Sequence, residues 1–278
     1  MAGEHPSHRW QISELPWATL APDKVDSDLL ATVKTAALVE ANSADYVRYL
    51  HNVFADDSEF RVAASVWGDE ESQHGEALGQ WAEKIDPTFN FAQSLAGFRR
   101  GYQLPLDATA SVRGSRAGEL VARCVVESGT CSFYSALRDS TTEPVLRRIC
   151  HQIAQDEAQH YRLFWTHMQR YLQSEPLSWW RRAKIALGRV TETSDDELAY
   201  AYYSANVVGQ SDQPYQRTLN ANAYFCRAFG RYQPQHLKTA VFMILHTLAL
   251  KPTARWAQWT VDGLWRLLQW RLRRLAQG

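Results

Sequence analysis

The chain contains 278 residues, enough for one large domain or two modest ones with a sizeable buried core. Its 30 basic and 30 acidic residues give a formal net charge of zero, which argues against a nucleic-acid-binding protein that works through a broad basic face. No stretch reaches the roughly 18–20 consecutive apolar residues of a membrane-spanning helix. We expect no secretory signal in the polar stretch Met1–Trp10. The four cysteines are dispersed without a CxxC pair, so reduced, mostly buried thiols and a cytoplasmic protein are expected.

Glycine and proline divide the first part of the chain into predicted helices. Residues 1–27 contain three prolines and are expected to form an irregular N-terminal segment. The predicted helices cover about 28–54, 59–84 and 117–139, and a fourth helix follows the Ser140–Pro144 turn and ends near Gln173. Residues 86–116 are expected to be a long, mostly non-regular connection with one short helix at most. Strand signals are weak, so the predicted class is all-α. Two helix pairs joined by one long crossover are typical of a ferritin-like four-helix bundle, here over 28–175.

Residues 176–278 are expected to form a C-terminal helical extension. Prolines separate its predicted helices, which are 195–209, 215–230, 235–250 and 255–276. Residues 251–278 carry six basic residues and one acidic residue. One face of the last helix is apolar and consists of Val261, Leu264, Trp265, Leu268, Leu272 and Leu275. We predict a basic amphipathic helix that packs on the bundle, lies on an anionic membrane or docks an acidic partner protein. The cluster Trp179, Trp180, Arg181 and Arg182 has the same aromatic and basic character.

Each predicted bundle helix carries an apolar stripe, and one glutamate interrupts each stripe near its middle. The four residues are Glu40, Glu71, Glu127 and Glu157. His74 and His160 follow two of these glutamates by three residues and therefore lie on the same helix faces. Four ionised carboxylates in an apolar core would be very unstable, because each of them loses its hydration. The pattern therefore predicts that the four glutamates and two histidines bind a pair of cations.

The residue types indicate which cations would suit this site. Each Glu-x-x-His pair can give one carboxylate oxygen and one nitrogen to a single ion, while the other two glutamates bridge the ions or complete the shell. Mixed oxygen and imidazole ligation suits iron or manganese better than calcium or a structural zinc. One glutamate from each of two helices and Glu-x-x-His from each of the other two is the ligand pattern of di-iron carboxylate proteins. The competing interpretation is that the glutamates are solvated on helix surfaces and the histidines are hydrogen-bonded.

Residues 28–172 resemble the ferritin-like superfamily, and within it most closely the soluble acyl-[acyl-carrier-protein] desaturases. The sequence WGDEESQHG at 67–75 is similar to the family's W-x-x-x-E-x-x-H-G, and IAQDEAQH at 153–160 is similar to its I-A-x-D-E-x-x-H. The resemblance implies two iron ions, with manganese as an alternative at one site. The six residues that match the family's ligands are Glu40, Glu71, His74, Glu127, Glu157 and His160.

The resemblance also implies roles for three neighbouring residues. Thr130 lies in Glu127-Ser-Gly-Thr130, which resembles the family's E-x-x-T, so it is expected to be catalytic by orienting an oxygen adduct or relaying protons. The alternative for Thr130 is a hydroxyl that bonds to its own helix. Asp156 is expected to hold the second ring nitrogen of His74 and to lie on an electron-entry path. Trp67 is expected just outside the ligands, either on an electron route or as a core residue.

The resemblance implies an O₂-dependent di-iron oxidoreductase that attacks an unactivated C–H bond, by desaturation or hydroxylation of an acyl-type substrate. A ferredoxin would be the external electron donor, acyl carrier protein the partner of the basic last helix, and a homodimer is expected. Three alternatives remain: a rubrerythrin-like ferroxidase or peroxidase, a di-iron oxygenase acting on a small metabolite, and a non-catalytic helical interaction protein. A long apolar cavity beside the metals would favour the acyl substrate, a short polar one the metabolite, and the lack of a cavity peroxide chemistry.

Overall fold

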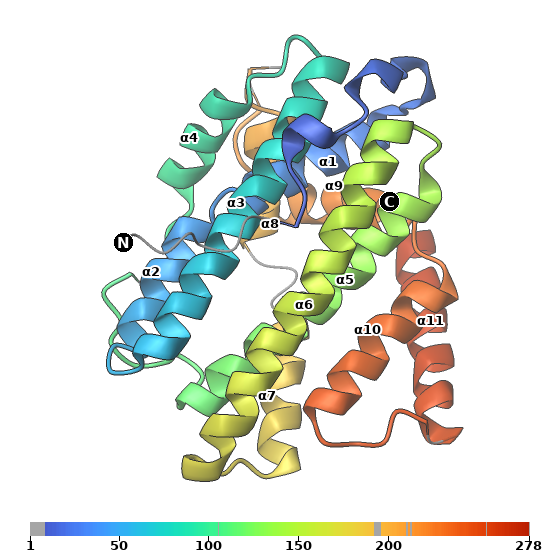
Figure 1. Ribbon diagram of the computed structural model, residues 1–278. Helices are drawn as coiled ribbons and strands as arrows, with labels where there is room; N and C mark the ends of the chain where they lie inside the picture. The colour runs from blue at the N-terminus through green and yellow to red at the C-terminus, as the bar shows by residue number, and fades with distance from the viewer. Residues whose placement is uncertain are drawn as a thin grey trace.

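The computed structural model describes residues 9–104, 106–191, 196–209, 211, 213–253 and 255–277. Within these ranges the chain forms α-helices, short 3₁₀ helices and turns, and contains no β-strand (Figure 1). The predicted all-α class is confirmed. Residues 1–8 of the predicted N-terminal segment and residue 195, the expected start of a helix, lie outside the described residues.

The helices agree closely with three of the four predicted ranges in the first part of the chain. In order, they are α1 (Ser27–Glu40), α2 (Ser43–Val53), α3 (Ser58–Ile85), α4 (Phe91–Gly101), α5 (Arg116–Ser140), α6 (Pro144–Ser174), α7 (Trp179–Thr191), α8 (Asp196–Asn206), α9 (Arg217–Phe229), α10 (Pro234–Thr247) and α11 (Arg255–Leu275). Three short 3₁₀ helices, Ile12–Glu14, Trp17–Thr19 and Pro22–Lys24, precede them.

The four helices that surround the centre of the molecule each begin at a side-chain cap. The carboxylate of Asp26 accepts a hydrogen bond from the amide of Leu29 at the start of α1, at 2.7 Å. The corresponding cap residues are Asp57 for α3, Ser115 for α5 and Glu143 for α6. Each cap satisfies a backbone N–H that has no partner within the helix, which fixes where the helix starts.

These helices pack in pairs around a centre (Figure 1). Helix α1 packs along α3, α5 packs along α6, and α3 contacts α6. The buried apolar side chains form two main clusters, one around Trp81 and Tyr134 and the other around Phe60 and Phe164. On α3, α5 and α6 the two clusters occupy opposite ends of the helix, so the middle turns of these helices form a polar layer between two apolar ones. The polar layer contains the predicted ligand residues.

The prediction of one continuous helix over 28–54 is wrong, because the chain breaks at Ala41 and Asn42. The guanidinium of Arg99 donates to the carbonyl oxygen of Ala41 at 2.6 Å, so the break leaves this acceptor satisfied. Helix α3 approaches the break closely at Gly75, where an added Cβ would lie 2.5 Å from the Ala41 nitrogen. Tertiary contacts therefore end α1 at Glu40, although the local sequence contains neither glycine nor proline.

The N-terminal segment packs on the core, and its described part is more ordered than the prediction of an irregular segment. Trp10 and Leu15 are 3% and 5% exposed and belong to the cluster around Trp81. The amide of Ala21 donates to Glu143, the same carboxylate that caps α6 and accepts from the indole of Trp81. A hydrogen bond to the cap residue therefore holds the segment against the start of α6.

The C-terminal helices cover the central ones. Helix α8 packs on α1, while α7 and α10 pack on α5, and α11 contacts α9 and α10. Helix α7 is absent from the predicted helices, because the stretch from Trp179 was interpreted only as an aromatic and basic cluster. No helix of the described residues is long and apolar enough to cross a membrane. Three of the four free cysteines are buried, as predicted, and Cys226 is half-buried.

Candidate metal centre

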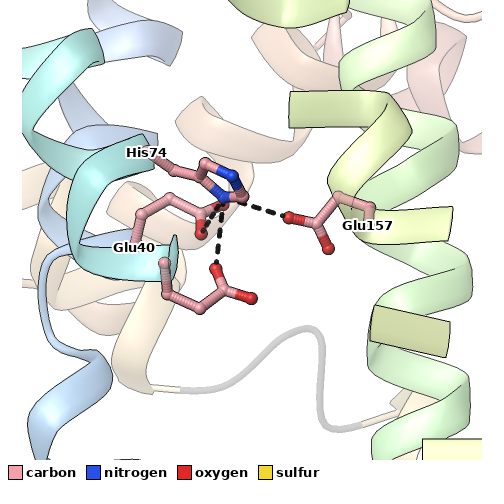
Figure 2. Close-up of side chains that lie close together, drawn as sticks. Glu40, His74 and Glu157 are labelled. Carbon is pink, nitrogen blue, oxygen red and sulfur yellow. Dashed lines mark ion pairs between the residues drawn. The ribbon is translucent and has the colours of Figure 1, made fainter. Parts of the chain in front are cut away.

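Six buried side chains meet in the polar layer between the two apolar clusters. They are the predicted ligands Glu40 of α1, Glu71 and His74 of α3, Glu127 of α5, and Glu157 and His160 of α6. All six are at most 8% exposed. Figure 2 shows Glu40 and Glu157 directed toward the imidazole of His74 from opposite sides. The interpretation that these glutamates are solvated on helix surfaces is therefore wrong.

The six residues form two overlapping groups that could each hold a metal ion. The His74 site consists of Glu40, Glu71, His74 and Glu157, and the His160 site consists of Glu71, Glu127, Glu157 and His160. Within each group one nitrogen or oxygen atom from every residue lies within 4.8 Å of the others. Two residues, Glu71 and Glu157, belong to both sites.

The shared glutamates face the two histidines through opposite oxygens. Glu71 Oε2 lies 3.6 Å from His74 Nδ1, and its Oε1 lies 3.1 Å from His160 Nδ1. Glu157 repeats this arrangement, with Oε1 3.5 Å from His74 Nδ1 and Oε2 4.0 Å from His160 Nδ1. A carboxylate in this position is suited to bridge two ions. The sequence left open whether Glu40 and Glu127 bridge the ions or complete the shell of one ion. The geometry favours completion of one shell for both residues.

Each of the remaining glutamates belongs to one site only. Glu40 Oε2 lies 4.0 Å from His74 Nδ1, and Glu127 Oε2 lies 3.7 Å from His160 Nδ1. The hydroxyl of Tyr134 donates to Glu40 Oε1. Tyr134 packs in the core and also fixes a carboxylate of the His74 site. Burial and the charge of Glu40 raise the pKa of Tyr134, which keeps this hydroxyl a donor.

Unpaired polar atoms show that the donor set fits a cation. Nδ1 of His74, Nδ1 of His160, Oε1 of Glu127 and Oε1 of Glu157 are buried and have no hydrogen-bond partner. Most separations between the Nδ1 atoms and the carboxylates exceed hydrogen-bond length. Two nitrogen or oxygen ligands about 2 Å from one ion stand about 3–4 Å apart, which is the spacing found here. The four atoms therefore have the burial, chemistry and separation of metal ligands.

The electrostatics of the site favour a positive charge at its centre. Burial, together with the carboxylates of Glu71 and Glu157, raises the pKa of Glu40 well above its usual range, and the pKa of Glu127 is raised in the same way. Burial lowers the pKa of His74, but the carboxylates of Asp156, Glu157 and Glu71 outweigh burial and hold this pKa well above its usual range. Protons take the place of cations at these ligands, so cation binding releases them.

Carboxylates hold the outer nitrogens of both histidines. Nε2 of His74 donates to Asp156 Oδ2 at 3.0 Å, which confirms the predicted pairing. Nε2 of His160 donates to Glu70 Oε2 at 2.7 Å, a contact that the sequence analysis missed. These bonds direct both Nδ1 atoms into the centre. Asp156 directly precedes Glu157 in the sequence, and Glu70 directly precedes Glu71. The shared pattern of two acids, one residue, glutamine and histidine, EESQH and DEAQH, is the signal that would have indicated Glu70.

Two residues of the N-terminal segment complete the surroundings of Asp156. The indole of Trp10 donates to Asp156 Oδ2 at 2.7 Å, and the guanidinium of Arg9 donates to Oδ1. The Trp10 ring lies parallel to the His74 ring, with centroids 6.2 Å apart. Burial raises the pKa of Asp156, but His74, Trp10 and Arg9 outweigh burial, and the pKa is lowered. No periodic pattern in the sequence links this segment to the centre, so both residues were missed.

Thr130 and Trp67 lie beside the ligands. The Thr130 hydroxyl donates to Glu157 Oε2 at 2.5 Å and also lies 3.2 Å from the carbonyl oxygen of Glu127 on its own helix. The bond to its own helix, the alternative considered for this residue, is therefore present, and the catalytic role stays a prediction. The Trp67 ring meets His160 edge-on, with centroids 6.5 Å apart, and packs on Phe164. Its indole nitrogen is buried without a partner.

Two surface pockets lie away from this centre. The larger, about 410 Å³, lies between the start of α3 and the end of α6, and its lining includes Asp57, Glu59 and Arg170. The smaller, about 190 Å³, lies at the start of α5. None of the six central residues lines either pocket. The acyl substrate therefore stays a prediction.

No protein-family model matches the chain, and no curated protein is significantly similar to it. The functional assignment therefore depends on the buried glutamate and histidine cluster, which could hold a metal ion.

Proposed function

We propose that the chain is a ferritin-like dinuclear iron protein and acts as an O₂-dependent oxidoreductase. In this proposal α1, α3, α5 and α6 are the bundle helices, and the segment between α3 and α5 is the long crossover. The observation that carries the proposal is the pair of ligand groups sharing Glu71 and Glu157. Two sites that share two carboxylates are suited to two ions at short separation, whereas a single ion would leave one histidine Nδ1 unpaired.

Charge and ligand type support two divalent transition-metal ions. Four carboxylates carry four negative charges, which two divalent cations neutralise in a layer where apolar side chains exclude water. Carboxylate and imidazole ligands suit iron and manganese. We assign iron to both sites, with manganese as the alternative at one of them.

The metal pair, when bound, would supply O₂ activation and one-electron chemistry. The protein would hold the ions in position, exclude water from the centre and control which molecules reach it. Asp156 and Glu70 hold the histidine rings in place from outside. Thr130 holds a proton at Glu157 Oε2, from where the hydroxyl can pass this proton to the centre. The reaction we assign is attack on an unactivated C–H bond of an acyl-type substrate, with electrons from an external donor such as a ferredoxin.

Metal analysis of purified variants tests the ligand assignment. The wild type should bind two irons per chain. Glu157→Ala should lose at least one iron and weaken both sites, because both share this residue. Glu40→Ala should lose only the ion of the His74 site, and Glu127→Ala only that of the His160 site. The control is Glu76→Ala, which changes an exposed glutamate on α3. A Glu157→Ala protein that retains two irons would contradict the proposal.

The role of Thr130 is tested by the reaction of the reduced protein with O₂. Thr130→Val removes the hydroxyl at Glu157 but keeps the shape of the side chain. We expect unchanged iron content and oxidation slower by about 100-fold, as is typical when a positioned proton donor is lost. Thr130→Ser should restore the rate. If Thr130→Val reacts as fast as the wild type, the hydroxyl serves only its helix.

The rubrerythrin-like alternative differs in its substrate, and neither of the two surface pockets offers a cavity for an acyl chain beside the centre. A peroxidase needs no elongated substrate cavity. The reduced, iron-loaded protein distinguishes the two functions when O₂ and hydrogen peroxide are compared as oxidants. Faster reaction with peroxide and no oxidation of supplied acyl substrates would replace the proposed C–H chemistry by peroxide reduction.

A further inference from the structure

Helix α11 is apolar on two sides, and only one of them packs against the protein. Ala257 and Val261 are buried against α10, and three residues of the predicted apolar face, Trp265, Leu268 and Leu272, are half-buried. The predicted face therefore packs mostly inward. It does not explain the remaining tryptophans of the helix.

The second side of α11 is an exposed stripe of large apolar residues. Trp256, Trp259, Leu267 and Trp270 are 41%, 71%, 56% and 52% exposed. With Gly263 they recur at intervals of three or four residues, so they lie on one face of the helix. Three exposed tryptophans on one helix are unusual for a surface that faces only water.

Basic side chains accompany this stripe. Arg255, Arg266 and Arg273 are exposed and recur at intervals of eleven and seven residues, so they form a row along the helix beside the tryptophans. Arg274 is also exposed, and its guanidinium lies 5.5 Å from the Trp270 ring. The one acidic residue of α11 is Asp262. Here the tryptophan face means the three tryptophans and Leu267 together with these four arginines.

Helix α7 adds a second aromatic and basic surface at the same end of the molecule (Figure 1). Trp180 and Leu187 are 68% and 66% exposed, and residues 179–191 contain four basic and no acidic residues. Ala186 of α7 is buried with Leu248, against which Leu250 packs. Leu250 also packs on the cluster of Ala257 and Val261 in α11. The two helices therefore flank the same connection after α10.

We propose that the tryptophan face binds peripherally to an anionic lipid bilayer. Tryptophan favours the boundary between headgroups and acyl chains, and arginine binds anionic headgroups. Charge complementarity disfavours a second copy of this chain, because a twofold pairing of the face would bring arginine rows together with one acidic residue per copy. An acidic partner protein would match the arginines but would leave three exposed tryptophans unexplained.

Vesicle sedimentation of the full-length protein tests this proposal. The wild type should sediment with vesicles made of equal parts phosphatidylglycerol and phosphatidylcholine and remain in solution with phosphatidylcholine alone. Raising the salt concentration should weaken binding, because salt screens the arginines. The double variant Trp259→Ala/Trp270→Ala and the double variant Arg266→Glu/Arg273→Glu should each bind at least about tenfold more weakly.

Two control variants match these changes elsewhere on the surface. Val62→Ala removes apolar surface from a residue of α3 that is 59% exposed, and Arg147→Glu/Arg148→Glu reverses two exposed charges on α6. Both controls should bind vesicles like the wild type. Glu157→Ala should also bind like the wild type, because the tryptophan face does not depend on the metal centre.

Three outcomes would overturn the proposal. The first is a wild type that does not sediment with anionic vesicles. The second is tryptophan variants that bind as tightly as the wild type. The third is a wild type that is a dimer in light scattering and does not bind vesicles, while the variant Trp259→Ala/Trp270→Ala is a monomer. This result would assign the face to a second copy of the chain.

Discussion

At the scale of single residues, the two central histidines are each held at their outer nitrogen by an acid from the opposite helix. Asp156 of α6 holds His74 of α3, and Glu70 of α3 holds His160 of α6. Such bonds fix the ring orientation and raise the basicity of the nitrogen that faces the metal. The two sites therefore have separate outer supports although they share two carboxylates.

Substitution of the outer acids should weaken the two sites separately. Glu70→Gln should lower the metal affinity of the His160 site by about 10–100-fold. A neutral amide is a weaker hydrogen-bond acceptor for the imidazole N–H than the charged carboxylate that it replaces. Asp156→Asn should do the same to the His74 site. Titration of metal against a competing chelator measures both affinities. Equal loss at both sites in either variant would contradict this separation.

A partly buried ion pair away from the centre should govern part of the pH dependence of stability. Lys34 is 3% exposed, and its ammonium lies 2.6 Å from Asp86 Oδ2. Burial raises the pKa of Asp86, but the hydrogen bond from Lys34 and those from Thr88 outweigh burial and lower the pKa from 3.8 to about 2. Because this pKa is lower in the folded state, the stabilisation is complete above pH 3.8 and is lost as the pH falls through about 2.

Asp86→Asn should therefore destabilise the protein by about 3 kcal/mol at neutral pH, since it leaves the Lys34 ammonium buried without its partner. The difference from the wild type should shrink as the pH falls below 4 toward 2. Urea unfolding at a series of pH values measures it, with the exposed Asp69→Asn as control. A difference that stays constant over this range would rule out the ion pair as its source.

The six central residues could be predicted because they follow a helical period, whereas Asp156 was predicted only through the resemblance of its motif. The six central residues lie on apolar stripes, and a stripe in a long helix must face the core whatever the details of packing. Glu70 lies one position off its stripe, so its contact depends on how α3 meets α6. Trp10 lies in a segment without periodicity, and only the folded chain brings it to Asp156.

At the scale of helices, the close approach of α3 to the break between α1 and α2 positions Glu40. The sequence predicts a helix through this point because it contains neither glycine nor proline there. The break results from contacts with α3 and α4, which are distant in sequence, and local propensity cannot indicate it.

Two glycine substitutions should have opposite effects on stability. Gly75→Ala should destabilise the protein by about 1–3 kcal/mol, because the new Cβ would overlap the backbone of Ala41. Gly129→Ala should stabilise it by about 0.5–1 kcal/mol, because its Cβ would meet no atom within 4 Å and alanine favours the helix. Chemical denaturation measures both. Equal stabilities would mean that the packing at Ala41 relaxes freely.

At the scale of the whole molecule, the polar layer between two apolar clusters couples metal binding to folding. The apo protein must keep several carboxylates and two imidazoles in a layer that excludes water, which is unfavourable unless protons are taken up. Bound cations remove this cost only in the folded state. Metal binding at this layer would therefore stabilise the fold as a whole.

Metal loading should raise the midpoint of thermal unfolding. At a free metal concentration 100 times the dissociation constant, binding adds about 2.7 kcal/mol, which corresponds to about 5–10 °C for a chain of this size. Differential scanning calorimetry with and without Fe²⁺ or Mn²⁺ measures the shift. Glu157→Ala should show a much smaller shift. An unchanged midpoint in the wild type would argue against binding at the polar layer.

The reciprocal hydrogen bonds between α3 and α6 hold the residues of these two helices more firmly than the two glutamates of α1 and α5. Sliding α3 along α6 would stretch the hydrogen bonds His74–Asp156 and His160–Glu70 at the same time. These two bonds therefore fix the position of α3 relative to α6. Glu40 and Glu127 come from the other two helices and each serve one site, and Glu127 Oε1 has no partner at all. In the proposed function, rearrangement at the centre would therefore fall to these two glutamates, and above all to Glu127, while the imidazoles would stay in place.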